Sequence, residues 1–176
     1  TARCLVLGTP DGQRTMSTFL GVSPLLENGE VDGNAIRPAA ILYLEGYLFD
    51  RPQAKRAFYE AADIAKDAGR KVALSLSDGF CVDRHRPELL ELIRTRVDIL
   101  LANADEITSL YGTGFEEAAK LAAKDAQLAA LTRSEKGSLI LEGGEAIEIP
   151  AEPVAKPTEP SQPQPPPSLA PPHQPR

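Results

Sequence analysis

Short apolar runs alternate with segments of helical periodicity along most of this chain. The apolar runs have strand length and little internal polar alternation, and they lie at 41–46, 71–77, 97–102 and 128–132. Between and after them, apolar residues recur at helical spacing, which predicts helices over 52–68, 87–94, 104–111 and 115–124. Strands that alternate with helices of this length predict an α/β fold with a parallel sheet. Apolar strand cores further predict a sheet covered on both faces.

Two hairpins flank this alternation. Strand-like runs at 4–7 and 15–20 are separated by Asp11-Gly12, a strong turn signal. This first hairpin is expected to form a flap or lid at the edge of the sheet. A second hairpin is predicted over 137–149, around Gly143-Gly144.

Proline content divides the chain near residue 150. Eleven of the 16 prolines lie from Pro150 onward, in a segment with almost no large apolar side chains. Such a segment cannot bury enough surface to offset its ordering entropy. We therefore expect a folded region over 1–150, with a lid-like hairpin at 1–21 and an α/β core at 38–150, and a disordered tail over 151–176. A Pro-x-x-Pro match at 163–166 is open to two interpretations, an SH3-type docking motif or ordinary tail composition.

Charge and cysteine content narrow the function classes. The formal net charge is −6 and no basic stripe is present, which argues against a nucleic-acid partner. No apolar run approaches the roughly 18 residues of a membrane span, and no signal peptide is visible. Cys4 and Cys81 lack metal-site spacing, and His85 does not complete a cluster in the sequence. We expect free thiols, buried or half-buried, in a reducing cytoplasm.

Asn103-x-x-Glu106 stands where the strand at 97–102 turns into a helical pattern. One interpretation is a helix cap, because Asn is a favoured N-cap residue and Glu three positions later resembles a capping box. The other is a site for a phosphate and its metal ion, because ligands of open α/β sheets bind beyond the carboxyl ends of strands. The two interpretations are compatible, since a capped helix start is where an anion would bind.

Two further polar segments follow strands. Thr132 to Gly137 has either the composition of a nucleotide-contacting turn, with a hydroxyl and backbone N–H groups, or that of a plain hairpin turn. It lacks the Walker pattern. The segment 77–86 follows the second strand, so Asp78, Asp83 and Arg84 could line the crevice; its simpler interpretation is a polar loop and helix start, because no catalytic triad is recognisable.

The order of these segments resembles a known family. Four segments, taken in order, look like the middle of a ribokinase-like (PfkB) carbohydrate and nucleoside kinase. They are Gln13-Arg14-Thr15-Met16-Ser17-Thr18-Phe19-Leu20-Gly21, Tyr43-Leu44-Glu45-Gly46-Tyr47, Asn103-x-x-Glu106 and Leu131-Thr132-Arg133-Ser134-Glu135-Lys136-Gly137. The adenosine-kinase-like branch is the most similar. The resemblance covers about residues 2–155, with the motifs in family order and spacing.

The resemblance implies a fold and an activity. The fold would be a three-layer ribokinase-like parallel sheet with helices on both faces and a partial β lid, incomplete at both ends. The activity would be transfer of the γ-phosphoryl group of ATP to a hydroxymethyl group of a sugar or nucleoside, with an adenosine-like acceptor favoured. Such transfer depends mainly on positioning and electrostatic stabilisation. The partner is thus a small molecule, and a homodimer through the lid is a further expectation.

The resemblance also implies site residues. Asn103 and Glu106 match the motif that organises Mg²⁺ and phosphate, with Glu106 acting on the metal through water. The residues that match the segment lining the ATP site are Thr132, Arg133, Ser134, Glu135 and Gly137. In the lid, Met16 and Phe19 could approach the substrate.

Two family features do not occur in the sequence. The glycine-rich substrate-binding region would precede Thr1, and no Gly-Ala-Gly-Asp, whose Asp is the family's catalytic base, follows Pro150. No Asp follows Asp125 at all. We therefore expect the chain itself to be inactive, with no catalytic residue of its own, and hypothesise that the abrupt tail is a frameshift product. The alternative is a non-catalytic module that binds a nucleotide or a protein.

Overall fold

The molecule is built around a mixed six-stranded sheet. The structure, a computed structural model, describes residues 2–10, 14–26 and 29–153. The strand order follows the chain, β3-β4-β5-β6-β7-β8. The first four strands are parallel, and β7 and β8 are antiparallel additions. The strands are β3 (Ile41–Glu45), β4 (Lys71–Ser75), β5 (Ile99–Asn103), β6 (Leu128–Thr132), β7 (Ser138–Glu142) and β8 (Glu145–Ile149).

Helices connect the parallel strands, as the periodicity predicted. These connecting helices are α2 (Pro52–Asp67), α3 (Gly79–Arg96), α4 (Ala104–Tyr111) and α5 (Phe115–Asp125), and a short helix, α1 (Gly33–Ile36), precedes β3. Pro52 occupies the first turn of α2 as expected, because its missing N–H costs nothing there. Gly112 ends α4 in the left-handed conformation, with φ of 62°. The α/β architecture is therefore confirmed.

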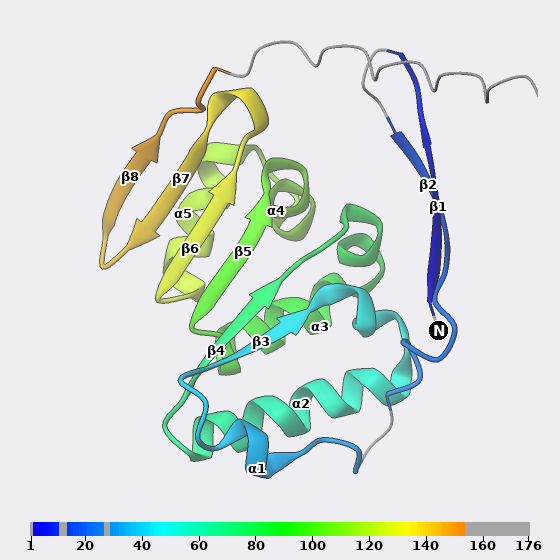
Figure 1. Cartoon of the computed structure of the whole chain (residues 1–176). Coiled ribbons are helices and arrows are strands. Elements are labelled where there is room, and N and C mark those ends of the chain that lie inside the picture. The colour runs from blue at the N-terminus through cyan, green and yellow to red at the C-terminus, as the bar shows by residue number, and fades with distance from the viewer. Residues whose placement is uncertain (1, 11–13, 27–28, 154–176) are drawn as a thin grey trace, which may run out of the picture.

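The helices cover one face of the sheet, which corrects the expectation of helices on both faces. Each right-handed crossover moves to the next strand in the same direction, so α2 to α5 fall on the same side; α3, α4 and α5 lie behind the strands in Figure 1. On that side Leu74, Leu100 and Leu131 are buried. On the other side Ile41 and Tyr43 are about half exposed, at 50% and 51%.

Two local elements differ from the prediction. A 3-10 helix, η1 (Gly46–Asp50), follows β3 where no element was expected. Helix α3 begins at Gly79 rather than near Pro87, because the Asp78 carboxylate caps it by accepting a hydrogen bond from the amide nitrogen of Phe80 at 2.8 Å. Non-helical angles at His85 (φ −121°, ψ 17°), two residues before Pro87, break the helix into two parts.

The amino-terminal hairpin stands apart from the sheet. Strands β1 (Arg3–Gly8) and β2 (Arg14–Phe19) pair with each other and form their own two-stranded sheet, and every residue in them is exposed. Figure 1 shows this hairpin beside the main sheet, not joined to it. The predicted hairpin is confirmed, although its turn at 11–13 lies outside the described residues, as does the tail from 154. Within the described ranges, no helix has the length and apolar character needed to cross a bilayer.

Candidate functional site

The register of the sheet brings the two candidate motifs together. Asn103 ends β5, Thr132 ends β6, and these two residues are partners in the parallel pairing of the strands. The two motifs, separated by 29 positions in sequence, therefore start from adjacent points at the carboxyl edge of the sheet. This edge is where α/β sheets bind ligands.

Asn103 and Glu106 form a complete capping box at the start of α4. The Asn103 side-chain oxygen accepts a hydrogen bond from the Glu106 amide nitrogen at 2.8 Å. In return, the Glu106 carboxylate accepts from the Asn103 backbone nitrogen at 2.9 Å and from its side-chain nitrogen at 2.8 Å. The helix-cap interpretation is confirmed, and it fixes the carboxylate at the carboxyl end of β5.

The Glu106 carboxylate lies in an environment that disfavours its negative charge. Burial raises the pKa of Glu106, and the charges of Asp78, Glu45 and Asp105 raise it further, whereas the hydrogen bond from the Asn103 backbone lowers it. A buried carboxylate surrounded by other carboxylates gains from a nearby cation. Each of its oxygens accepts from Asn103, and each keeps a lone pair for a further donor such as a metal-bound water.

The turn after β6 is a tight, locally hydrogen-bonded structure. Its short 3-10 helix, η2 (Ser134–Lys136), begins with Ser134 in the left-handed region at φ 52°. The Arg133 amide donates to the Gly137 carbonyl at 2.7 Å, and the Gly137 amide donates to the Ser134 carbonyl at 3.0 Å. Gly137 has φ 79° and ψ −140°, which only glycine adopts without strain. The predicted turn thus forms, with a defined shape.

A pocket of about 440 Å³ lies between this turn and the start of α4. Its lining comes from both motifs and from α5: Asn103, Ala104, Asp105, Phe115, Glu116, Thr132, Arg133, Ser134, Glu135 and Lys136. The Arg133 guanidinium lies over the Phe115 ring at 5.6 Å, and its buried Nε has no hydrogen-bond partner among the described residues. Gly137 does not line the pocket; it closes the turn beneath it.

Two further hollows include Asn103 and, unlike the first pocket, Glu106. One, of about 520 Å³, extends toward Tyr47, Asp78 and the amino terminus of α3. The other, of about 670 Å³, extends over the open face of the sheet toward Glu45. Asp78 and Asp83 therefore line the crevice, as one interpretation of the segment 77–86 held. Arg84 does not line these hollows and pairs with Asp50 instead.

Glu45 is a site residue that the sequence motifs did not single out. It ends β3, accepts a hydrogen bond from the Tyr43 hydroxyl at 2.7 Å, and accepts another from the Ser77 hydroxyl. Ser77 adopts φ 68°, and a side chain at Gly46 would approach the Leu76 carbonyl oxygen to 2.5 Å. The signal that could have found Glu45 is its position: a carboxylate followed by glycine at the end of an apolar strand.

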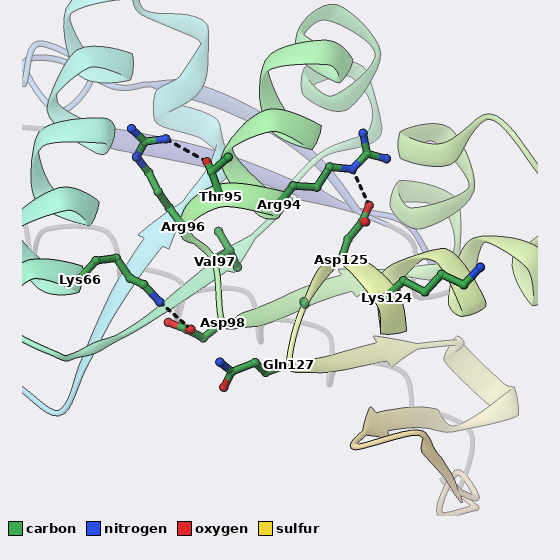
Figure 2. A pocket seen from close by; sticks show the side chains of 10 residues that line it. Lys66, Arg94, Thr95, Arg96, Val97, Asp98, Lys124, Asp125 and Gln127 are labelled. Atoms are coloured by element: carbon green, nitrogen blue, oxygen red, sulfur yellow. Dashed lines mark hydrogen bonds and ion pairs between the residues drawn. The ribbon is translucent and has the colours of Figure 1, made fainter.

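The opposite edge of the sheet carries another hollow, of about 370 Å³, rich in basic side chains (Figure 2). Lys66, Arg94 and Lys124 lie in the last turns of α2, α3 and α5. Cations there complement the negative ends of the helix dipoles. In Figure 2 Lys66 is paired with Asp98 at 2.7 Å and Arg94 with Asp125 at 3.0 Å. These cations serve the fold, and negative helix ends make this edge unfavourable for a phosphate.

Replacing Asp98 is expected to reduce stability more than replacing other carboxylates in ion pairs. Asp98 is buried, and its second oxygen accepts a hydrogen bond from the Val72 amide at 2.8 Å. Asp98→Ala leaves that buried amide unpaired, so the free energy of unfolding should fall by about 2–3 kcal/mol in urea denaturation. The matched control is Asp63→Ala, which removes the exposed partner of Arg96 and should cost less than about 1 kcal/mol. Equal losses in both variants would contradict this account.

Met16 and Phe19 lie away from these hollows. Both are on β2 and exposed, at 58% and 69%, and neither lines the hollows around Asn103. Their contact with a substrate stays a prediction.

Comparison with known proteins fixes the family. The pfkB family of carbohydrate kinases matches residues 1–160. The chain belongs to this pfkB family. A probable sugar kinase protein from Rhizobium etli CFN 42 is 44% identical, with a TM-score of 0.83 over 89% of this chain and 48% of that one. The adenosine kinase from Sinorhizobium meliloti is 43% identical, with a TM-score of 0.83 over 90% of this chain and 49% of that one.

A more distant structure shares the fold alone. It is an Escherichia coli protein of the ribokinase II type, solved with ATP and Mg²⁺, at 16% identity and a TM-score of 0.70. The match covers 80% of this chain and 48% of that one. No curated protein matches the sequence. This pfkB chain thus spans about half the length of the relatives it resembles, and the ribokinase-like fold expected from the motifs is confirmed.

Proposed function

We propose that this chain carries the nucleotide- and metal-organising half of an ATP-dependent kinase that phosphorylates a hydroxymethyl group of a sugar or nucleoside. The observation that carries the proposal is the pairing of Asn103 with Thr132, which brings the turn after β6 beside the buried carboxylate of Glu106. Glu106 and Thr132 line one hollow, and the turn lines the pocket next to it. Family membership supports the reaction class. The 43% identity to a Sinorhizobium meliloti adenosine kinase favours an adenosine-like acceptor.

The residues present fit ATP and Mg²⁺. Mg²⁺ prefers oxygen ligands and usually keeps several waters, which suits a carboxylate such as Glu106 that acts through water. The Thr132 and Ser134 hydroxyls and the Arg133 guanidinium line the pocket and supply donors for phosphate oxygens. When bound, Mg²⁺ would neutralise the charge that develops on the phosphoryl group. The role of this chain's residues is to hold the metal waters and the phosphates in place.

We propose further that the chain as printed binds nucleotide without transferring its phosphoryl group. The support is that no Asp follows Asp125 in the sequence, so no residue matches the family's catalytic base. A second function, a non-catalytic nucleotide-binding module, makes the same binding prediction. In either case we expect the exposed hairpin of β1 and β2, which carries Met16 and Phe19, to cover the acceptor substrate or to pair with the same hairpin of a second copy of the chain.

Two measurements on the 176-residue chain test this function. Equilibrium dialysis with ATP and Mg²⁺ should show one nucleotide site, and a coupled phosphotransfer assay with adenosine or ribose should show no turnover. Turnover at rates usual for kinases would overturn the inactivity of the chain. Absence of nucleotide binding by the folded chain would overturn the nucleotide site itself.

A further inference from the structure

A cluster of potential metal ligands lies outside the nucleotide site, where η1 meets α3. Asp50 ends η1, and Cys81 and His85 lie one helical turn apart on α3. One ligand atom from each of the three lies within 4.8 Å of the others. Spacing along the chain does not reveal this cluster, because Asp50 belongs to a different element from Cys81 and His85.

We propose that Asp50, Cys81 and His85 form a binding site for a transition-metal ion of the Zn²⁺ type. The donor set decides the class of metal. A thiolate, an imidazole and a carboxylate suit Zn²⁺ or Co²⁺, whereas Mg²⁺ selects oxygen ligands alone. The site is therefore chemically distinct from the magnesium-organising carboxylate of Glu106.

The surroundings hold the His85 ring in an orientation suited to a ligand. Its Nε2 atom lies 2.9 Å from Asp50 Oδ1, inside the cluster, and its Nδ1 atom lies 3.2 Å from the Glu88 carboxylate. A carboxylate on the other ring nitrogen is the usual support of a metal-bound histidine. The Phe49 ring packs edge-on against His85 at 5.7 Å and fixes its plane. The nearby Lys55 ammonium, 3.3 Å from Nδ1, is itself neutralised by Glu88 at 2.7 Å.

Asp50 is oriented in a similar way. Arg84 donates to Asp50 Oδ2 through Nη2 at 2.7 Å and to Oδ1 through Nε at 3.1 Å. Oδ1 remains directed at the cluster, and a hydrogen-bonded carboxylate is the common form of a metal-ligating one. Tetrahedral binding at about 2.0–2.3 Å per bond needs ligand atoms about 3.5 Å apart. Small side-chain rotations therefore suffice to close the site, and solvent can supply the fourth ligand because Asp50 is exposed.

Because Cys81 is buried, metal binding requires the removal of a proton from a thiol whose pKa is raised. Its thiol donates to the Gly46 carbonyl at 3.3 Å, and burial raises its pKa to about 11, so the thiol is protonated at neutral pH. Metal binding replaces this S–H bond by a metal–sulfur bond and releases one proton to solvent. The product ties η1 to α3 and so fixes the carboxyl end of β3.

Cobalt titration of the 176-residue chain tests the site. One equivalent of Co²⁺ should produce a thiolate-to-cobalt charge-transfer band, and added Zn²⁺ should remove it. Cys81→Ser should abolish the band. The matched control is Cys4→Ser, which removes the exposed thiol of β1 and should leave the band unchanged. No band in the wild-type chain, or a band that survives in Cys81→Ser, would overturn the proposal.

Two further variants keep the test decisive should Cys81→Ser fail to fold. Glu88→Gln removes the carboxylate behind His85 and should retain the band while weakening Zn²⁺ binding by about 10–100-fold. Asp50→Asn should also weaken binding. Unchanged Zn²⁺ affinity in both folded variants would overturn the proposed site.

Discussion

Glu106→Gln is expected to weaken Mg²⁺-dependent ATP binding by about 10–100-fold while leaving the fold intact, because the carboxylate acts on the metal through water. Gln is accepted at the third position of a capping box, so its side-chain oxygen can still accept from the Asn103 backbone. The neutral amide also escapes the charge-disfavouring environment that raises the pKa of Glu106. Isothermal titration calorimetry with ATP, with and without Mg²⁺, measures the effect.

A second variant distinguishes the effect of losing the helix cap from the effect of losing the metal-organising carboxylate. Asn103→Ala removes the acceptor for the Glu106 amide, and its expected cost is about 1 kcal/mol of unfolding free energy. If Glu106→Gln lowers stability as Asn103→Ala does and leaves nucleotide affinity unchanged, Glu106 serves only as a helix cap.

Gly137→Ala is expected to destabilise the chain by about 3 kcal/mol or more. Its φ of 79° and ψ of −140° form a region that costs side-chain-bearing residues about 1–3 kcal/mol. A Cβ there would also overlap the Ile149 carbonyl oxygen and approach the Ala151 amide nitrogen to 2.7 Å. The turn must therefore move away from β8, which disturbs the pocket wall as well. Urea denaturation and circular dichroism measure the loss.

The chain offers a matched control for that substitution. Gly144, in the β7–β8 turn, has φ of 85°, and a Cβ there would meet nothing within 4 Å. Gly144→Ala should therefore cost only the backbone strain, about 1 kcal/mol. A similar loss in both variants would show that close approach to β8 is not what requires glycine at position 137.

Local signals in the sequence predicted those parts of the site that lie within one segment. The capping box of Asn103 and Glu106 could be predicted because both partners are three residues apart. The helix from Pro52 could be predicted from its apolar spacing and its proline. The turn at Gly137 could be predicted because its polar residues lie between two strands.

Features that depend on the meeting of distant segments could not be predicted. The Tyr43–Glu45–Ser77 contacts and the Asp50–Cys81–His85 cluster each join residues from two separate segments of the chain. The start of α3 was missed because Pro87 resembles a helix start, whereas Asp78 caps the helix earlier. The open face was missed because Ile99, Leu101 and Ala130 are apolar, although they lie on the side without helices and remain partly exposed.

Amide chemical-shift mapping with ATP and Mg²⁺ shows where the nucleotide binds. We expect the shifted amides to cluster at Asn103 to Glu106 and at Thr132 to Gly137, on the two strand ends that the sheet register joins. Amides near Lys66, Arg94 and Lys124, at the opposite edge, should not move. Shifts concentrated at that basic edge, or none at Asn103 and Thr132, would contradict the nucleotide site described above.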